Sequence, residues 1–252
     1  MTSVRARLRA AGIHLGISFC VAALAAALVF GLWYPYPYRE IAGGRELFLL
    51  LVGVDVVLGP LLTLAVFNRA KPWTELRRDL AVIALLQVAA LGYGLWTVAS
   101  ARPVHLVFEI DRFRVVHAVD VPPQLLGRAP AGVDALPWTG PTLLAVRPFR
   151  SEQEKMDVTL VALQGVALSA RPDLWLAYEA ARPAVLAAAK PVSELRARLA
   201  AQAGAIDAAV AATGRPAKDL VYLPLAGRKS FWTVLLDGAD ARVVGFVAVD
   251  AF

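Results

Sequence analysis

Three long runs of apolar residues occupy the first hundred positions of the chain, at residues 13–34, 47–67 and 80–99. Each run has the roughly 20 residues that an α-helix needs to cross ~30 Å of hydrocarbon. Ionisable groups are scarce in the first two runs: the second holds only Asp55, and the first holds only His14, Tyr34 and the thiol of Cys20. We therefore predict a domain of three transmembrane helices over residues 1–100.

The first run has an alternative interpretation as a cleaved signal peptide, because basic residues precede it. Its apolar stretch exceeds the usual length of about 7–15 residues, and its small-residue site at 25–27 is followed by further apolar residues. The run ends in aromatic residues and prolines at 33–38, and such aromatics are typical of a membrane–water boundary. We predict a retained helix.

The basic residues that flank the runs predict the orientation of the chain. Two of them, Arg39 and Arg45, lie in the loop 35–46. Seven lie in the amino-terminal tail and the loop 68–79, namely Arg5, Arg7, Arg9, Arg69, Lys71, Arg77 and Arg78. The positive-inside rule then places the N-terminus in the cytoplasm, and three crossings place residues 101–252 on the far side. In a bacterium with two membranes, this describes a multi-pass inner-membrane protein with a periplasmic C-terminal domain.

Composition narrows the class of protein. Hydrophobic residues make up 58% of the 252 positions and charged residues 18%, against about 45–50% and 25% in ordinary soluble domains. These values exclude a disordered chain, a collagen-like fibre and a plain soluble enzyme. Cys20 is the single cysteine, so an intrachain disulfide is excluded.

The net charge of +6 divides into +4 for residues 1–100 and +2 for residues 101–252. Because the second part has no basic block, we predict no nucleic-acid partner.

Residues 101–252 are long enough for an independent core. The pattern predicts strands at 105–111, 114–121, 143–146, 220–225, 230–236 and 243–249, and helices at 152–168, 184–189 and 193–213. In the first strand, Leu106, Phe108 and Ile110 share one face, which predicts a half-buried strand. The last helix has the clearest signals, with Ser193 as N-cap and Gly214 after its end. We expect an α+β domain with a small antiparallel sheet.

Asp55 is the most unusual residue of the apolar runs, because an ionised carboxylate at the middle of a membrane helix costs about 3 kcal/mol. We expect it to face protein, protonated or hydrogen-bonded. Gln87 and Tyr93 bracket its depth on the antiparallel third helix. Three interpretations are open: a polar clamp between helices, a contact to a partner helix, and a proton or ion relay. A relay needs a chain of titratable groups, which the three runs lack.

Pro60 follows Asp55 in the same run and removes the backbone hydrogen bond to the carbonyl of Val56. It fits either a packing kink or a groove opened for a partner. Gly12 and Gly16 add a small-xxx-small face to the first run, a pattern that favours helix contacts and is also common by chance.

His105, Glu109 and Asp111 share one face of the first predicted strand, and His117 lies on the next strand. This raises the hypothesis of a zinc site, but ligation requires three or four converging ligands with fixed hydrogen-bond partners. We interpret the four as solvated surface residues and predict no metal, cofactor or catalytic residue. The sequence contains no G-x-S-x-G, Walker A, H-E-x-x-H or C-x-x-C motif.

Several longer blocks carry a family resemblance. They are WYP at 33–35 with PY at 37–38, GVDVVLGPLLT at 53–63, VFN at 66–68, ELRRDLAVIALLQ at 75–87 with YG at 93–94, ARP at 101–103 and VFEIDRF at 107–113. With these blocks the chain resembles the TfpX/TfpZ family of type IV pilin accessory proteins over about residues 13–117. The resemblance implies an inner-membrane protein that supports the stability of the pilin or its entry into the fibre, and it supplies no catalytic residues.

The resemblance and the architecture together predict a non-catalytic inner-membrane accessory factor or chaperone for type IV pilin. A pilin before assembly is a single membrane helix with a periplasmic head, so a chaperone needs contacts at both levels. The expected partners are the transmembrane helix and head of the major pilin, membrane lipid and other pilus assembly proteins. The alternatives are a membrane enzyme that modifies pilin or envelope components, and a sensor or secretion scaffold.

Overall fold

The computed structural model describes residues 2–68 and 70–252, so Arg69, which contributes to the predicted orientation, lies outside the described residues. The described chain divides into two compact units. The first, which we call the helical unit, comprises the chain up to Pro35 together with Gly44–Ser100. The second, which we call the sheet unit, comprises Tyr36–Gly43 and Ala101–Phe252.

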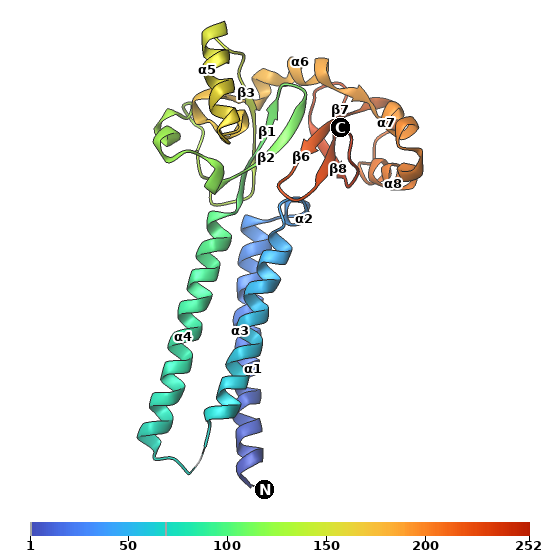
Figure 1. Cartoon of the computed structure of the whole chain (residues 1–252). Helices are drawn as coiled ribbons and strands as arrows, with labels where there is room; N and C mark the ends of the chain where they lie inside the picture. Colours follow the sequence, from blue (N-terminus) through green and yellow to red (C-terminus); the bar gives the residue numbers. More distant parts are fainter. Residues whose placement is uncertain (1, 69) are drawn as a thin grey trace. The chain divides into compact units, whose positions relative to one another are not determined.

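The helical unit consists of long helices that run side by side (Figure 1). They are α1 (Thr2–Leu28), which continues as a π-helix at Val29–Trp33, α3 (Gly44–Val66) and α4 (Trp73–Ser100). Among the described residues, these three helices are long and apolar enough to cross a membrane. The prediction of three long apolar helices is therefore confirmed, and each helix begins before its apolar run.

Small residues and one tyrosine fix the packing of these helices. A side chain at Gly94 of α4 would overlap Leu51 of α3, so the glycine permits a close approach. The hydroxyl of Tyr34 donates a hydrogen bond of 3.2 Å to the carbonyl of Val98. Large apolar side chains point away from the unit, and the most exposed include Leu24, Leu50 and Leu85. An apolar outer surface of this kind is compatible with insertion into a membrane.

The sheet unit contains one mixed sheet, in which eight strands take part among residues 101–252. They are β1 (Pro103–Glu109), β2 (Arg112–His117), β3 (Thr142–Val146), β4 (Trp175–Ala177), β5 (Lys190–Pro191), β6 (Leu220–Ala226), β7 (Phe231–Asp237) and β8 (Val243–Val247). The order is β4-β3-β1-β2-β6-β7-β8, and β5 pairs with β6.

The predicted small antiparallel sheet is wrong, because the pairs β1–β3 and β2–β6 are parallel. The other neighbouring strands are antiparallel. The alternation of apolar residues locates a strand but does not show which distant segment lies beside it. The positions of the strands could therefore be predicted, whereas the mixed pairing could not.

Strand β1 also differs from the half-buried strand that its alternation predicts, because all of its residues are buried. Leu106 and Phe108 pack into one core, whereas Val107 packs into a second core. The strand lies in the middle of the sheet between β2 and β3, so both of its faces are covered. Ile110 is not part of the strand: it lies in the following turn at φ 59° and is exposed.

The predicted helix over 193–213 is divided into two helices. These are α7 (Val192–Arg198) and α8 (Ala203–Ala212), separated by a 3-10 turn at Ala200–Gln202. Leu199 leaves the helical region at φ −109° and ψ 50°. The break allows Leu195 and Ile206, both fully buried, to enter one core. Ser193 does not cap α7, because the N-cap position is Pro191.

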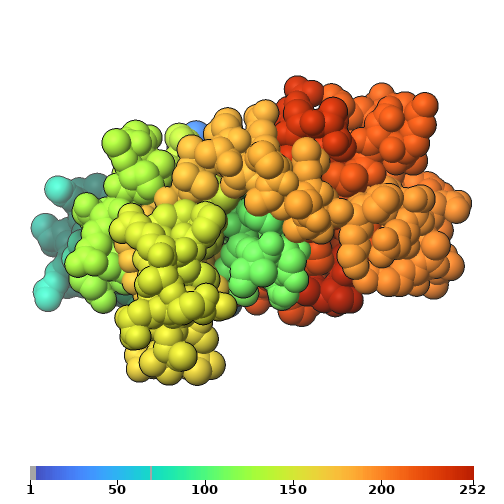
Figure 2. Space-filling model, turned by 90° about the horizontal axis from the view of Figure 1, so that it is seen from above, coloured from blue at the N-terminus to red at the C-terminus, as the bar shows by residue number. Residues whose placement is uncertain are grey.

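Three further helices belong to the sheet unit. They are α2 (Tyr38–Ile41), α5 (Glu152–Leu163) and α6 (Tyr178–Ala188). Figure 2 shows α5, in yellow, standing out from the rest of this unit. Helix α2 contributes Ile41, which is fully buried in the core beside β6 and β7. The segment that precedes α3 in sequence is therefore part of the core of the sheet unit.

Candidate functional site

Asp55 and Gln87 meet between α3 and α4. The side-chain amide of Gln87 donates hydrogen bonds of 3.2 Å to the carboxylate Oδ1 and to the backbone carbonyl of Asp55. Gly59 lies one turn after Asp55 and leaves room for the amide, because a side chain there would overlap Gln87. Residues four apart share one face of a helix, so Asp55 and Gly59 face α4 together.

Tyr93 and Pro60, the other two residues that the sequence singles out, lie apart from this pair. Tyr93 is exposed, and its ring contacts Trp96. It follows Gln87 by six residues, and at about 100° per residue this separation places it on another face of α4. Pro60 lies inside α3, which continues to Val66.

A second polar pair, which the sequence does not single out, connects α1 to α3. The ring Nδ1 of His14 and the hydroxyl of Thr63 are 2.5 Å apart. Ser18 lies one turn after His14, and both Ser18 and Thr63 are buried. The sequence signal for these residues is their spacing. Asp55, Gly59 and Thr63 recur every four residues, as do His14 and Ser18, so each set shares one face of its helix.

Both pairs border a cavity of about 460 Å³ between α1, α3 and α4, which we call the helix cavity. Its polar lining consists of His14, Ser18, Asp55, Thr63 and Gln87. The apolar lining comes from α1, from α4 and from Phe67, which follows α3, and it includes Ile17, Val21, Leu80, Ile83 and Leu91. A largely apolar cavity with a few polar groups suits an apolar ligand that carries one or two hydrogen-bonding groups.

His105 is a structural residue in the sheet unit. Its Nε2 lies 3.1 Å from the carbonyl of Ala135, which can only accept, and its Nδ1 lies 2.7 Å from the hydroxyl of Thr142. Its ring packs edge-on against Trp175. Burial lowers the pKa of His105 to about 4. The imidazole is therefore neutral, and both nitrogens already have partners.

The other residues of the zinc hypothesis do not converge. Glu109 accepts hydrogen bonds from Arg114 at 2.7 Å and from the backbone N–H of Ser169 at 3.2 Å. Asp111 is exposed and pairs with its neighbour Arg112. The described residues contain no group of three or more His, Cys, Asp or Glu side chains that could hold a metal ion.

The interpretation of these residues as solvated is wrong for His105, Glu109 and His117, which are all buried, and correct for Asp111. His117 contacts Asp120 through Nδ1 at 3.1 Å, and Arg228 donates to the same carboxylate. The physical reason for the error is that both faces of β1 and β2 are covered, so their polar residues are enclosed with the apolar ones.

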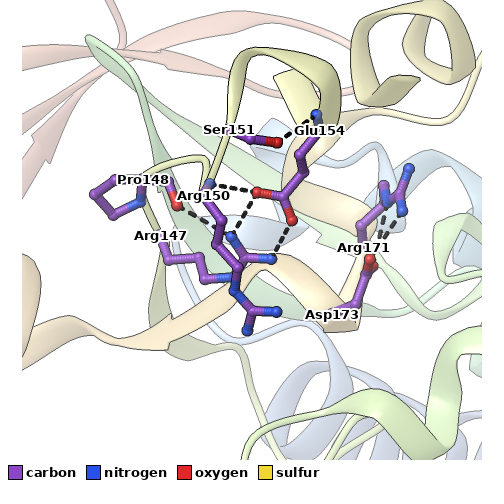
Figure 3. A network of polar contacts seen from close by, with 7 residues as sticks. All are labelled: Arg147, Pro148, Arg150, Ser151, Glu154, Arg171 and Asp173. Carbon is purple, nitrogen blue, oxygen red and sulfur yellow. Dashed lines mark hydrogen bonds and ion pairs between the residues drawn. The ribbon is translucent and has the colours of Figure 1, made fainter. Parts of the chain in front are cut away.

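A network of arginines and one carboxylate fixes the start of α5 (Figure 3). The guanidinium of Arg147 donates two hydrogen bonds to Glu154, at 2.6 and 3.0 Å, and the backbone N–H of Arg150 donates to the same carboxylate. Ser151 caps the helix by accepting from the N–H of Glu154. The Arg147 guanidinium lowers the pKa of Glu154 to about 2. These hydrogen bonds anchor the start of α5.

Comparison with known proteins gives one consistent result. A family described as "Fimbrial assembly protein FimB" matches residues 2–43. The fimbrial assembly protein of serogroup I from Dichelobacter nodosus is 36% identical over 243 residues, which cover 96% of this chain and 94% of that protein. The serogroup E1 protein of the same organism is 35% identical over the same shares of both chains.

A shorter relative, the fimbrial assembly protein of serogroups C1 and C2, is 44% identical over 110 residues, or 44% of this chain and 84% of that protein. No solved structure matches the chain. The two longer alignments cover 96% of the chain, so they extend over both the helical unit and the sheet unit. The chain therefore belongs to the family of fimbrial assembly proteins.

Proposed function

We propose that this chain is a non-catalytic inner-membrane accessory factor, of the TfpX/TfpZ kind, that binds type IV pilin and supports its assembly into the pilus. The family membership supports a role in pilus assembly. The helix cavity is the observation that carries the finer proposal, because it offers polar groups inside an apolar bundle. The occupant that we propose is the transmembrane helix of the major pilin.

The arrangement of the polar groups suits a helix as occupant. Asp55 and Thr63 are eight residues apart on α3, which corresponds to about 12 Å along the helix axis. Hydrogen-bonding groups therefore lie at two levels of one apolar cavity. An apolar helix packs along such a wall and can place one polar side chain at either level. Membrane lipid would surround the remaining apolar faces.

The proposal that the chain is not an enzyme is supported by the partners of His105 and Glu109, two of its buried polar residues. His105 and Glu109 are both engaged within the sheet unit. General acid–base catalysis needs a group with a free position toward a substrate. An enzyme that modifies pilin would need another set of residues.

The proposed orientation has the N-terminus in the cytoplasm and the sheet unit in the periplasm. Alkaline phosphatase fused after Ser151 should be active, and the enzyme fused after Lys71 should be inactive at equal fusion levels. The opposite pattern of activities would overturn the orientation.

The test of the function is co-purification from native membranes. A tagged copy of the full chain should enrich the major pilin well above the level that an unrelated three-helix membrane protein with the same tag retains. Pilin at the level of this control, with the tagged chain present at normal amount, would overturn the proposal.

A further inference from the structure

The sheet is interrupted along one edge of β6. Strand β7 pairs with β6 over the whole length Leu220–Ala226, so the other two neighbours of β6 share its opposite edge. Strand β5 pairs there with residues 221–222, and β2 pairs with residues 225–226. Leu223 and Pro224 have no strand partner on this edge among the described residues, and Pro224 has no N–H to donate. A gap therefore separates β5 from β2.

A cavity of about 270 Å³ lies at this gap, and residues of β2, β5 and β6 line it. Pockets that hold drug-sized ligands have about 300–1,000 Å³, so this cavity suits a smaller group. Three of its lining side chains are basic, namely Arg112, Lys190 and Arg198. Asp111 is the one acidic side chain among the described residues that line it. The cavity therefore has an excess of positive charge.

Arg198, the last residue of α7, carries the charge that is not neutralised. Asp111 pairs with Arg112 at 2.7 Å, and Glu194 lies 3.6 Å from Lys190. The guanidinium of Arg198 instead donates to a backbone carbonyl at 2.5 Å, and no acidic side chain in the described part of the chain pairs with it. A guanidinium has five N–H donors in a planar fork that matches a carboxylate.

The hydroxyl of Tyr222 is a second unused group at the cavity. Tyr222 lines the cavity from β6, lies opposite Lys190 of β5, and is only 1% exposed. Its hydroxyl has no hydrogen-bond partner among the described residues. Burial raises the pKa of this hydroxyl and the charge of Arg198 opposes that shift, so the guanidinium acts on the hydroxyl without bonding to it. A buried hydroxyl without a partner costs free energy, which favours a ligand that accepts a hydrogen bond from it.

We propose that this cavity, which we call the sheet-gap site, binds a carboxylate group through Arg198 and Tyr222. Both side chains would donate hydrogen bonds to the carboxylate oxygens. A carboxylate carries one negative charge, which matches the single basic side chain that lacks an acidic partner among the described residues of the site. Leu223, Pro224 and Phe252 provide an apolar wall for a small uncharged group beside the carboxylate. The carboxylate belongs either to a free small molecule or to an acidic side chain of the pilin.

Ligand-detected NMR on the full chain in a neutral detergent tests the site with two matched probes. N-acetylglycine carries a carboxylate on a small uncharged group, and N-acetylglycinamide has nearly the same shape without the charge. Saturation transfer from the protein should be clear for the acid and weak for the amide at equal concentration. Equal transfer to both probes would overturn the proposal. Inorganic phosphate that displaces the acid at a lower concentration than acetate does would also overturn it.

Two arginine variants of α7 show whether the acid binds at this site. Arg198→Gln removes the unneutralised charge, whereas Arg196→Gln removes an arginine that pairs with Asp207 and does not line the cavity. Arg198→Gln should weaken binding of N-acetylglycine at least about tenfold, because hydrogen bonds from a charged group are lost. Arg196→Gln should bind the acid within about twofold of the unchanged chain. Equal binding by the two variants would overturn the site.

A tyrosine variant separates binding from folding. Tyr222→Phe should weaken binding of the acid about fivefold without lowering the transition temperature in detergent, because the lost hydroxyl has no partner in the described chain. Tyr178→Phe is the control, since the Tyr178 hydroxyl donates to the carbonyl of Ala241 at 2.6 Å and lies outside the cavity. It should lower the transition temperature by about 2–4 °C and leave binding unchanged. A Tyr222→Phe protein that loses stability and keeps binding would assign the hydroxyl a structural role and overturn the site.

Pilin co-purification with the two arginine variants identifies the source of the carboxylate. If Arg198→Gln loses both N-acetylglycine and pilin while Arg196→Gln keeps both, the carboxylate belongs to the pilin. If Arg198→Gln loses only N-acetylglycine, the carboxylate belongs to a free small molecule. Probe binding is measured without pilin, so a failure of the proposed function leaves the sheet-gap site standing, and a failure of the site leaves the proposed function standing.

Discussion

Buried polar side chains have different surroundings in the helical unit and in the sheet unit. In the sheet unit, both nitrogens of His105 and both carboxylate oxygens of Glu109 contact other protein groups. In the helical unit, the half-buried Asp55 and the buried Thr63 also have partners, but they border a cavity of about 460 Å³. The comparison separates polar residues that are enclosed in a core from polar residues that border a cavity.

The two units also differ in where their apolar residues lie. The helices carry many large apolar side chains on their outer surface, whereas the sheet unit encloses most of them in three cores. An apolar surface without a polar rim suits a lipid environment and a helical partner. The two units therefore need different tests. Variants of the helical unit should be tested for pilin binding in the cavity, and variants of the sheet unit for their stability.

Filling the helix cavity should give the largest effect on pilin binding. Ala84 lines the cavity from α4, and Ala84→Phe would occupy part of it, whereas Ala90→Phe changes an exposed position on another face of the same helix. We expect Ala84→Phe to reduce co-purified pilin at least about tenfold, equivalent to about 1.4 kcal/mol. Quantitative immunoblots of pilin per tagged chain measure the change. If the two variants retained equal amounts of pilin, the cavity would not be the pilin-binding site.

His105 should give the largest effect on stability. Its pKa is lowered from 6.5 to about 4 in the folded chain. Between these values the unfolded chain binds a proton that the folded chain excludes, so stability falls as the pH drops through this window, by up to about 3 kcal/mol. Glu154, with a pKa of about 2 against 4.5, loses its contribution only at lower pH.

The measurement is thermal unfolding of the full chain in detergent at several pH values between about 7.5 and 4.5. His105→Asn should have a lower transition temperature at neutral pH and a weaker dependence on pH in this window. A variant that keeps the full pH dependence would show that another group carries it.

Asp55 should give a smaller effect. Hydrogen bonds between membrane helices average about 0.6 kcal/mol each, and Gln87 makes two with Asp55. Asp55→Asn retains hydrogen-bonding capacity and should support normal piliation. Asp55→Leu removes only the bond to the side chain, since the other reaches the backbone carbonyl, and should lower the stability of the bundle by about 0.6 kcal/mol. Thermal unfolding and pilin co-purification measure the two outcomes. If both variants lose pilin at normal stability, Asp55 contacts the partner instead of serving as a clamp.

Asp111 should give the smallest effect. It is exposed and pairs with Arg112 at the surface, and such pairs contribute between about 0 and 1 kcal/mol. Asp111→Ala should leave expression, folding and pilus-dependent twitching unchanged. A stable Asp111→Ala protein without pili would reopen the metal and enzyme hypotheses for the sheet unit.

The sequence predicts the features that depend on local pattern. The three apolar helices and the approximate positions of β1, β3, β6, β7 and β8 follow from hydrophobic runs and alternation. The proximity of Gln87 to Asp55 follows from depth counting on antiparallel helices. The position of Tyr93 away from Asp55 does not follow from depth counting, because this method ignores the rotation of a residue about the helix axis.

The features that depend on distant contacts could not be predicted. His14 and Thr63 are 49 residues apart, and nothing in either local pattern pairs them. The burial of His105 and Glu109 follows from the central position of β1, which the sequence does not reveal. The break at Leu199 arises because α7 and α8 share one core, and this overrides helical periodicity.

Photocrosslinking in living cells tests the central claim, that the helix cavity receives the pilin helix, most directly. Ile17 and Phe19 are both exposed on α1, but only Ile17 lines the cavity. A benzophenone amino acid introduced at residue 17 of the full chain should form an adduct with the major pilin on irradiation, and the same group at residue 19 should not. Pilin adducts of equal yield at both positions, or none at residue 17 in cells that assemble pili, would contradict the account.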